Sequence, residues 1–312
     1  MRPSVLALRA LNLGDLLVAV PALRALRRHW PQHRLHLATS AWLAPVVELI
    51  GGVDQLVPAN GLTALDGVES PDVAVNLHGA GPESNAVLDA LAPRRRIGHR
   101  GHGWDGPMWT DDGHERQRWC RMLAAHGIPC DADDLLLRPP STPSIAPGVV
   151  VIHPGAGYGS RRWPVERYAQ VAARIGDRVV VTGTARERAL ASAVGVPDQD
   201  VLAGRLDLAQ LAALIAEARL VISGDTGVAH LCYAYRTPSV VLFGPAPVEQ
   251  WGPPADGPHR PLTVASARRG DPFADDPDPA LLGVDVDAVL ARAAELPATP
   301  PDRRRTNPRR QV

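Results

Sequence analysis

Lysine is absent from this chain, and all 33 of its basic residues are arginine. The absence excludes a lysine Schiff base and the lysine of a Walker-type phosphate loop. Any clamp for a phosphate must therefore use arginine or backbone amides.

Cysteine is scarce. Cys120, Cys130 and Cys232 show no C-x-x-C spacing, so the sequence predicts neither a zinc site nor a disulfide framework and fits a reducing cytosol. No segment approaches the ~20 apolar residues of a membrane-spanning helix. No cleavable signal precedes the first strand pattern. We expect a cytoplasmic protein, soluble or peripheral at the inner face of the cytoplasmic membrane.

Net charge is zero, but the arginines are unevenly distributed. Five arginines and Asp302 fall in the C-terminal tail, which leaves residues 1–301 at about −4 by subtraction. An acidic body argues against nucleic acid as a partner. We expect the Pro- and Arg-rich tail to be disordered, with a contact to anionic lipid or a partner as the alternative.

A repeated alternation of strand and helix patterns is present. With 312 residues and 45% apolar content, the chain can bury substantial cores, and its length favours two domains. Predicted strands cover 5–10, 34–38, 72–77, 149–153, 178–182, 220–223 and 239–243. Predicted helices cover 42–49, 84–91, 185–194 and 286–296, and others begin near Val18, Pro164, Asp207 and Thr226. The alternation predicts parallel sheets, and 253–279 reads as a loop.

Two helix starts carry local signals. Pro21 costs least in a first turn, so either the regular helix begins near Val18 or a kink follows Asp15. Asp207 with Gln210 three residues later resembles a capping box.

The proline-rich segment 139–148 has the composition of a linker. We therefore expect a first domain over 1–140, a linker at 141–148 and a second domain over 149–280. A C-terminal helix within 281–297 and a disordered tail at 298–312 follow. Two doubly wound domains joined in this way would place the carboxyl ends of both sheets around one cleft, where such sheets bind ligands.

The strand at 220–223 runs into Gly224, Asp225, Thr226 and Gly227, where a helix must begin. Thr226 can cap that helix, and Gly227 leaves room for a ligand. Unpaired N–H groups and the positive end of the helix dipole suit a phosphate or pyrophosphate. His230 lies one turn further on. The alternatives are an ordinary strand-to-helix turn and a core histidine bonded to a carbonyl.

Four segments in order resemble glycosyltransferase family 9, the heptosyltransferase family. They read L-N-L-G-D-L-L-V-A-V-P-A-L (11–23), H-P-G-A-G-Y-G-S-R-R-W-P (153–164), D-T-G-V-A-H (225–230) and L-F-G-P-A-P-V-E-Q-W-G-P (242–253). The resemblance implies a GT-B fold: α/β, with two Rossmann-like doubly wound domains facing across a cleft. It also implies an inverting glycosyltransferase that uses no metal or other cofactor. The implied substrates are a nucleotide-diphosphate sugar, ADP-heptose, and a cell-envelope glycan or glycolipid acceptor, as in lipopolysaccharide biosynthesis.

The resemblance makes Asp15 the base that deprotonates the acceptor hydroxyl, with a plain helix N-cap as the alternative. Asn12 and Gly14 would shape its turn. His78 belongs to the loop 76–85, which, with the loop 94–109, is expected to bind the acceptor. The arginines at 94, 95, 96 and 100 could instead be a solvated charge run.

On the donor side, the resemblance assigns the leaving phosphate to Arg162, where the family commonly has lysine, and Arg161 could share the role. Gly155 and Ala156 permit close approach of backbone to the ligand. Glu187 would accept from the ribose hydroxyls, or it is a first-turn glutamate stabilised by the helix dipole. The remaining donor-binding residues are Asp225, Thr226, Gly227 and His230.

Three D-x-D pairs, at 131/133, 276/278 and 285/287, match a pattern that holds metal in GT-A enzymes. None ends an apolar strand, so we expect solvated or capping acids and transfer that survives EDTA.

Other activities fit the same architecture less well. A nucleotide-sugar 2-epimerase would use the same diphosphate site and need no acceptor. A dinucleotide oxidoreductase is disfavoured because Ser160 occupies the third glycine position of the fingerprint. A non-catalytic sugar-binding protein is disfavoured because Asp15 is present.

Overall fold

The computed structural model describes residues 2–297. The chain divides into two compact units, of which the first ends at Arg138 and the second begins at Pro139. This division falls at the start of the proline-rich segment 139–148. The basic tail 298–312, expected to be disordered, lies outside the described residues.

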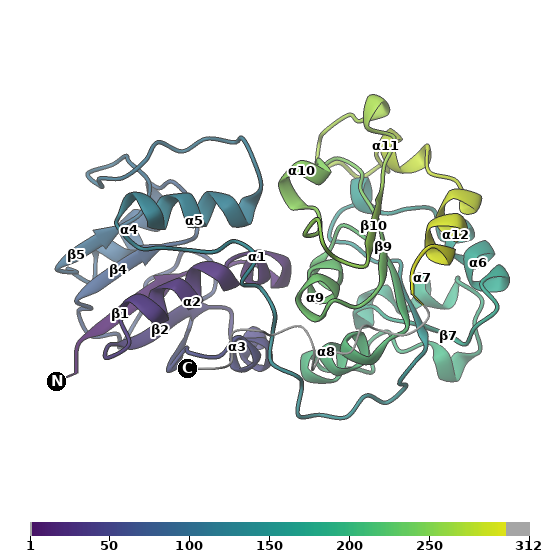
Figure 1. Ribbon diagram of the computed structural model, residues 1–312, viewed down its shortest axis with the longest axis horizontal. Coiled ribbons are helices and arrows are strands. Elements are labelled where there is room, and N and C mark those ends of the chain that lie inside the picture. Colours follow the sequence, from purple (N-terminus) through teal and green to yellow (C-terminus); the bar gives the residue numbers. More distant parts are fainter. Residues whose placement is uncertain (1, 298–312) are drawn as a thin grey trace. The chain divides into compact units, whose positions relative to one another are not determined.

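In residues 2–138, a parallel sheet of five strands has the order β3-β2-β1-β4-β5 (Figure 1). The strands are β1 (Ser4–Leu8), β2 (Arg34–Thr39), β3 (Gln55–Pro58), β4 (Val73–Asn76) and β5 (Arg95–Ile97). The chain first moves outward from β1 to β3 and then crosses to the other side of β1. This reversal lies between β1 and β4, and ligands bind at such switch points in open α/β sheets.

The helices of this unit are α1 (Leu13–Val18), α2 (Val20–His29), α3 (Ala44–Ile50), α4 (Glu83–Asp89) and α5 (Glu115–Ala125). α2 and α5 pack side by side (Figure 1). Leu6 and Leu8 of β1 alternate onto one face of the sheet, where they join a core with Leu88 of α4 and Trp104. Since β1 is central, its carboxyl end is fixed by strands on both sides.

In residues 139–297, the parallel sheet has the order β10-β9-β8-β6-β7. Its strands are β6 (Val150–His153), β7 (Val179–Val181), β8 (Leu220–Gly224), β9 (Ser239–Leu242) and β10 (His259–Leu262). Here the order reverses between β6 and β8. The central strand β8 is buried along its whole length.

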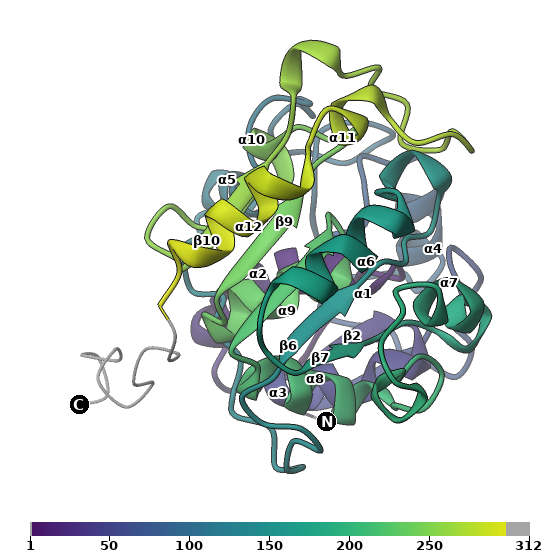
Figure 2. The same cartoon turned by 90° about the vertical axis from the view of Figure 1, so that its right-hand side faces the viewer.

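The helices of the second unit are α6 (Val165–Arg174), α7 (Arg188–Ser192), α8 (Leu208–Glu217), α9 (Gly227–Tyr235), α10 (Val248–Trp251), α11 (Pro279–Leu282) and α12 (Val286–Ala294). α6 and α12 pack together (Figure 2), as do α8 and α9. Val150 and Ile152 of β6 share a core with Tyr168 of α6 and Val289 of α12.

The predicted alternation and parallel sheets are confirmed, but β3, β5, β10, α5 and the short helices α10 and α11 were not predicted. The three strands are short edge or near-edge elements with polar residues or proline, and α5 has a weak apolar stripe. β10 lies inside the segment 253–279, so reading all of that segment as a loop was wrong. The arginine run has structural contacts: Arg94 pairs with Asp72 and Arg96 with Asp89.

The helices near Pro21 and Asp207 begin as follows from their local sequence signals. The helical pattern breaks at Ala19, and Pro21 falls in the first turn of α2, so a short helix precedes the break and carries Asp15. Asp207 caps α8, and Gln210 completes the capping box, which confirms that prediction.

The structure joins Cys120 of α5 to Cys130 in a disulfide, which corrects the prediction of none. The chain reverses after α5 and brings the two Cα atoms to 5.0 Å, within the usual range for a bridge. Residue spacing alone does not reveal that reversal. Cys232 is free and buried, and burial raises the pKa of its thiol. Among residues 2–297, no helix has the length and apolarity to cross a bilayer.

Candidate functional site

Asp15 lies in α1, directly after the central strand β1 of the first unit. Its side chain is 26% exposed. The side chain of Arg9 approaches it from the buried side, with Nη2 at 3.5 Å from the carboxylate Oδ1. The backbone of α1 is anchored by the same residue, since Arg9 Nε donates to the Asp15 carbonyl at 2.9 Å. Asp15 is therefore a half-buried carboxylate at the switch point between β1 and β4.

The prediction that Asn12 and Gly14 shape the turn before Asp15 is correct only for Asn12, because α1 begins at Leu13 and Gly14 is already helical. Asn12 is the exposed N-cap residue of α1, and its carbonyl accepts from the N–H of Leu16. Its side chain makes no capping hydrogen bond. Because Asp15 itself lies inside the helix, the alternative reading of Asp15 as N-cap is wrong.

His78 follows β4, on the other side of the switch point. Its N–H donates to Asn76 Oδ1 at 2.9 Å, and Asn76 in turn donates to Ser84 and Asn85. The buried Asn76 thus holds the loop 76–85 together. Burial lowers the pKa of His78, nearby Arg9 lowers it further, and Asp15 opposes both. His78 is expected to be a neutral imidazole beside the Asp15 carboxylate.

In the second unit, Thr226 is the N-cap residue of α9, and Gly227 is its first helical residue. The expected side-chain cap is not made: Thr226 Oγ1 is buried and has no hydrogen-bond partner among the described residues. Ser223 Oγ, Ser160 Oγ and Arg161 Nε share this condition within residues 2–297. Since buried polar groups are nearly always paired, their grouping at one sheet edge indicates a polar ligand or ordered water.

The loop that carries Ser160 and Arg161 packs directly on the carboxyl ends of β8 and β9. A Cβ at Gly224 would lie 3.0 Å from the Arg161 carbonyl, and one at Gly244 would lie 3.0 Å from the Ser160 carbonyl. The glycines therefore permit this close approach. The loop and the start of α9 form one surface.

The two adjacent arginines differ in their surroundings. Arg161 is 32% exposed at its side chain, and its Nη1 lies 4.0 Å from Asp225 Oδ2. Arg162 is exposed, and its Nε and Nη2 both donate to the carbonyl of Ala156. Arg161 thus points toward the start of α9, whereas Arg162 braces the loop 155–162.

Glu187 takes part in a capping box at Thr184, where its Oε2 accepts from both the N–H and the hydroxyl of Thr184. A Cβ at Gly155 would clash with Glu187 Oε1. Gly155 is therefore required for the carboxylate to lie against this turn. Glu187 thus has the structural role that was its alternative to ribose binding, since Oε2 takes part in the helix cap. Its other oxygen, Oε1, faces the loop after β6.

His230 and Asp225 form a buried pair, with Nε2 and Oδ1 3.9 Å apart. The His230 ring also meets Tyr233 and Trp251, with centroids 5.3 and 6.0 Å away. α9, α10 and the β8 loop thus converge on one imidazole, one turn from Thr226.

Four of the six D-x-D acids have structural partners at their side chains. Asp278 caps α11 and accepts from the N–H groups of Arg269 and Gly270, Asp285 caps α12, and Asp287 pairs with Arg174. Asp131 accepts from the N–H of Asp133. These contacts agree with the interpretation as capping or solvated acids. No group of three His, Cys, Asp or Glu side chains in the described part of the chain could hold a metal ion.

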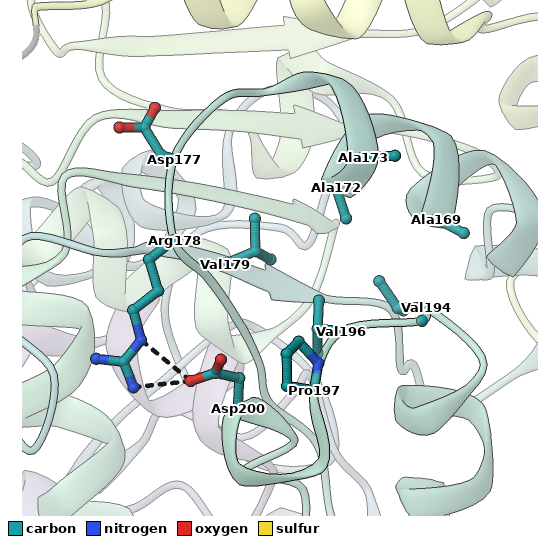
Figure 3. Close-up of a pocket in the computed structure, with 11 residues that line it drawn as sticks. Ala169, Ala172, Ala173, Asp177, Arg178, Val179, Val194, Val196, Pro197 and Asp200 are labelled. Atoms are coloured by element: carbon teal, nitrogen blue, oxygen red, sulfur yellow. Dashed lines mark hydrogen bonds and ion pairs between the residues drawn. The ribbon is translucent and has the colours of Figure 1, made fainter.

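A hollow of about 390 Å³ lies elsewhere in the second unit, between α6 and the segment 194–200 (Figure 3). Small apolar side chains line it, and the ion pair of Arg178 with Asp200 closes one side. Arg178 precedes β7, so this hollow is at the amino end of the strand. Ligands of parallel sheets bind at the opposite, carboxyl end.

Four residues of these two surfaces were not predicted from the sequence. Arg9 and Glu115, which form an ion pair, lie near Asp15, and Ser160 and Ser223 lie near Thr226. Arg9 and Ser223 stand next to a strand end, which was an available signal. Glu115 and Ser160 reach their positions only through tertiary folding.

Comparison with known proteins gives a consistent result. Residues 132–260 match the model of glycosyltransferase family 9 (heptosyltransferase). Lipopolysaccharide heptosyltransferase 2 of Escherichia coli K12 is 27% identical over 281 residues, covering 75% of this chain and 80% of that protein. Lipopolysaccharide heptosyltransferase 1 of Pseudomonas aeruginosa is 37% identical over 106 residues, covering 32% of this chain and 29% of that protein.

Solved structures extend the likeness to both units. The ADP-heptose lps heptosyltransferase II of E. coli aligns with TM-score 0.74 and 20% identity, covering 94% of this chain and 98% of that one. The glycosyl transferase family 9 structure from Veillonella parvula DSM 2008 aligns with TM-score 0.75 and 18% identity, covering 94% and 96%. These alignments confirm the predicted fold class, two Rossmann-like α/β domains of GT-B type.

Proposed function

Because this chain belongs to glycosyltransferase family 9 and is a glycosyltransferase, we propose that it transfers a heptose from ADP-heptose to a glycan of the lipopolysaccharide core type. Its matched relatives carry the name heptosyltransferase, and one solved neighbour, the WaaC heptosyltransferase of E. coli, holds ADP-2-deoxy-2-fluoro heptose. We propose inversion at the anomeric carbon and no requirement for metal. The reaction would take place in the cytoplasm, with a peripheral contact to the membrane that carries the acceptor.

The observation that carries this proposal is the set of buried polar atoms without partners in residues 2–297, at the carboxyl ends of β6 and β8 and the start of α9. A diphosphate supplies acceptor oxygens for hydroxyls, a guanidinium and the helix N-terminal amides together. Thr226, Gly227 and Arg161 would bind the diphosphate, with Asp225 and His230 nearby. Glu187 and the small-residue turn at Gly155 and Ala156 would lie beside the ribose.

Between the two arginines, the surroundings favour Arg161 as the phosphate ligand. Arg162 Nε and Nη2 are taken by the Ala156 carbonyl, which suits a residue that shapes the loop. Arg161 faces the start of α9, where the dipole favours the same anion. We therefore propose that Arg161 neutralises the departing ADP and that Arg162 supports its loop.

Asp15 would be the general base. The acceptor hydroxyl attacks C1 of the heptose, the bond from C1 to the diphosphate oxygen breaks, and Asp15 receives the hydroxyl proton. Arg161 and the α9 amides stabilise the charge that develops on the leaving phosphate. One displacement of this kind inverts the anomeric configuration. Because the donor charge would be neutralised by arginine and amides, we propose that no metal is needed. Asp278, Asp285 and Asp287 of the D-x-D pairs are already engaged in helix caps or an ion pair.

The test is transfer from ADP-heptose to a heptose-deficient lipopolysaccharide core, followed by release of ADP and by NMR of the new anomeric centre. We expect an inverted product and a rate unchanged by EDTA. A retained configuration or a loss of rate in EDTA would refute that part of the proposal. Omitting the acceptor should leave only slow hydrolysis. A new sugar isomer formed without acceptor would instead indicate the 2-epimerase, and no reaction with any ADP-sugar would refute the donor assignment.

A further inference from the structure

Arg9 is a buried cation at the carboxyl end of β1, only 1% exposed. Its backbone is fixed by β2, since its N–H donates to the Ala38 carbonyl and its carbonyl accepts from Thr39 Oγ1. Burial lowers the pKa of Arg9, while the carboxylates of Asp15 and Glu115 oppose that shift. An arginine stays protonated in proteins. A permanent positive charge is therefore held inside the first unit, beside Asp15.

The Arg9 guanidinium connects three separate elements. Nε donates to the Asp15 carbonyl in α1 at 2.9 Å, and Nη1 donates to the Leu77 carbonyl after β4 at 2.6 Å. Nη2 lies 3.5 Å from Asp15 Oδ1 and 3.5 Å from Glu115 Oε1 of α5. The guanidinium also stacks on Trp119, 4.9 Å from the ring centroid. Arg9 thus spans the switch point between β1 and β4.

α1 has only six residues, so it depends on tertiary contacts such as the hydrogen bond from Arg9 to the Asp15 carbonyl. It ends at Val18, and the N–H of Ala19 donates to Leu16. Pro21 has no N–H and cannot extend the ladder. A helix of this length is marginal without tertiary contacts. The buried side chains of Leu13, Leu16, Leu17 and Val18 pack α1 against the core, and the hydrogen bond from Arg9 to the Asp15 carbonyl fixes the backbone at the residue that carries the carboxylate.

Glu115 limits how strongly Arg9 binds the Asp15 carboxylate. It receives Arg9 Nη2 on one oxygen and forms an ion pair with Arg118 through the other. With Nη2 shared between two carboxylates at 3.5 Å, the short contacts of Arg9 go to carbonyls. Asp15 keeps a charged neighbour without a short ion pair, so its oxygens remain available to a hydroxyl.

We propose that Arg9 is the positioning residue of the catalytic base: it fixes the backbone at Asp15, and Glu115 keeps it from binding the Asp15 carboxylate. The inference rests on the proposed role of Asp15. Because Arg9 is buried, we expect it to act through Asp15 and not through contact with substrate. Its loss should lower kcat by about 100-fold, the effect of displacing a reacting group by about 1 Å, without changing the affinity for ADP, which the other domain binds.

The experiment compares Arg9→Met and Arg9→Lys with a matched control, Arg24→Lys. Arg24 is another partly buried arginine of the first unit that pairs with Asp134 and with the carbonyls of Ile50 and Leu136. Measurements are kcat, KM for ADP-heptose, the Kd for ADP and the melting temperature. We expect Arg9→Met to lower kcat and the melting temperature without changing the Kd for ADP, Arg9→Lys to keep part of kcat, and Arg24→Lys to lower only the melting temperature. If Arg9→Met does not fold, Arg9→Lys and Glu115→Gln carry the test, each with lowered kcat and unchanged Kd.

A double-mutant cycle separates this inference from the proposed function. In an Asp15→Asn background, the Arg9 substitution should lower the residual kcat no further, because a residue that acts through Asp15 has nothing left to position. Full additivity, or a fully active Arg9→Met with an inactive Asp15→Asn, would refute the positioning role while leaving the base intact. A fully active Asp15→Asn would refute the proposed base itself.

Discussion

Asp15 and Thr226 occupy corresponding places in the two domains, yet their surroundings differ. Each follows the central strand of a parallel sheet, β1 or β8, where a helix begins beside the topological switch point. Around Asp15, the donors of Arg9 are engaged by carbonyls and carboxylates. Around Thr226, buried hydroxyls and a guanidinium nitrogen have no partners within residues 2–297.

The difference agrees with the two roles proposed for these surfaces. A general base must be held in place before the substrate arrives, so its supporting hydrogen bonds belong to the protein itself. A diphosphate site instead leaves its donors for the ligand, which replaces water when it binds. We therefore expect substitutions near Asp15 to change turnover, and substitutions near Thr226 to change donor affinity.

The largest effect is expected for Asp15→Ala. Loss of a general base lowers the rate by about 10²- to 10⁴-fold, so kcat should fall by that amount. ADP affinity and melting temperature should stay close to those of the wild type, because the side chain is partly exposed and the donor domain is untouched. Steady-state kinetics and calorimetry with ADP check this, with Asp15→Asn as the isosteric control. Near-normal turnover in either variant would contradict the base assignment.

Next in size is the contrast between Arg161→Ala and Arg162→Ala. A hydrogen bond to a charged group contributes about 1.5–3 kcal/mol, so Arg161→Ala should weaken ADP binding by about 10- to 100-fold. Arg162→Ala changes an exposed side chain, and its effect should be about 2-fold. Calorimetry with ADP measures both. The reverse order would restore Arg162 as the phosphate ligand, the position that family resemblance assigns to it.

Thr226→Val should have a smaller effect on ADP affinity, and it should lower this affinity without lowering the melting temperature. Valine replaces a hydroxyl that has no partner among the described residues, so the melting temperature should stay the same or rise. ADP affinity should fall by about 3- to 10-fold, which is one neutral hydrogen bond.

The matched control is Thr237→Val, because Thr237 Oγ1 is buried and donates to the Ile215 carbonyl at 2.8 Å. This control should lower the melting temperature and leave ADP affinity unchanged. If both variants behave alike, the Thr226 hydroxyl has no role in donor binding.

The sequence predicted the two α/β units and the strand ends on which both surfaces stand, because apolar runs and helical periodicity are local signals. It also predicted the cap position of Thr226, but it placed Gly14 in a turn, whereas Gly14 lies inside α1. It could not predict that Arg9 would be buried, since arginine is usually exposed, or that Glu115 would reach it across 106 positions. The choice between Arg161 and Arg162 also depends on how the loop turns, which local composition does not encode.

The smallest expected effect is the decrease in folding stability at acidic pH. Burial lowers the pKa of His36, His78 and His99 in the first domain and of His153 in the second, below the ordinary value of 6.5. Below pH 6.5 the unfolded chain therefore binds more protons at these histidines than the folded chain does. The free energy of unfolding is highest above pH 6.5, where the histidines are neutral in both states, and it decreases as the pH falls from 6.5 through the folded-state pKa values.

Melting temperature should accordingly drop by a few °C between pH 7 and pH 5. Because three of these four histidines belong to the first domain, its amides should lose protection from hydrogen exchange at a higher pH than those of the second domain. Hydrogen exchange resolved by domain measures this difference. His153→Gln should flatten the pH dependence of the second domain only, and an unchanged slope there would assign its acid sensitivity to other groups.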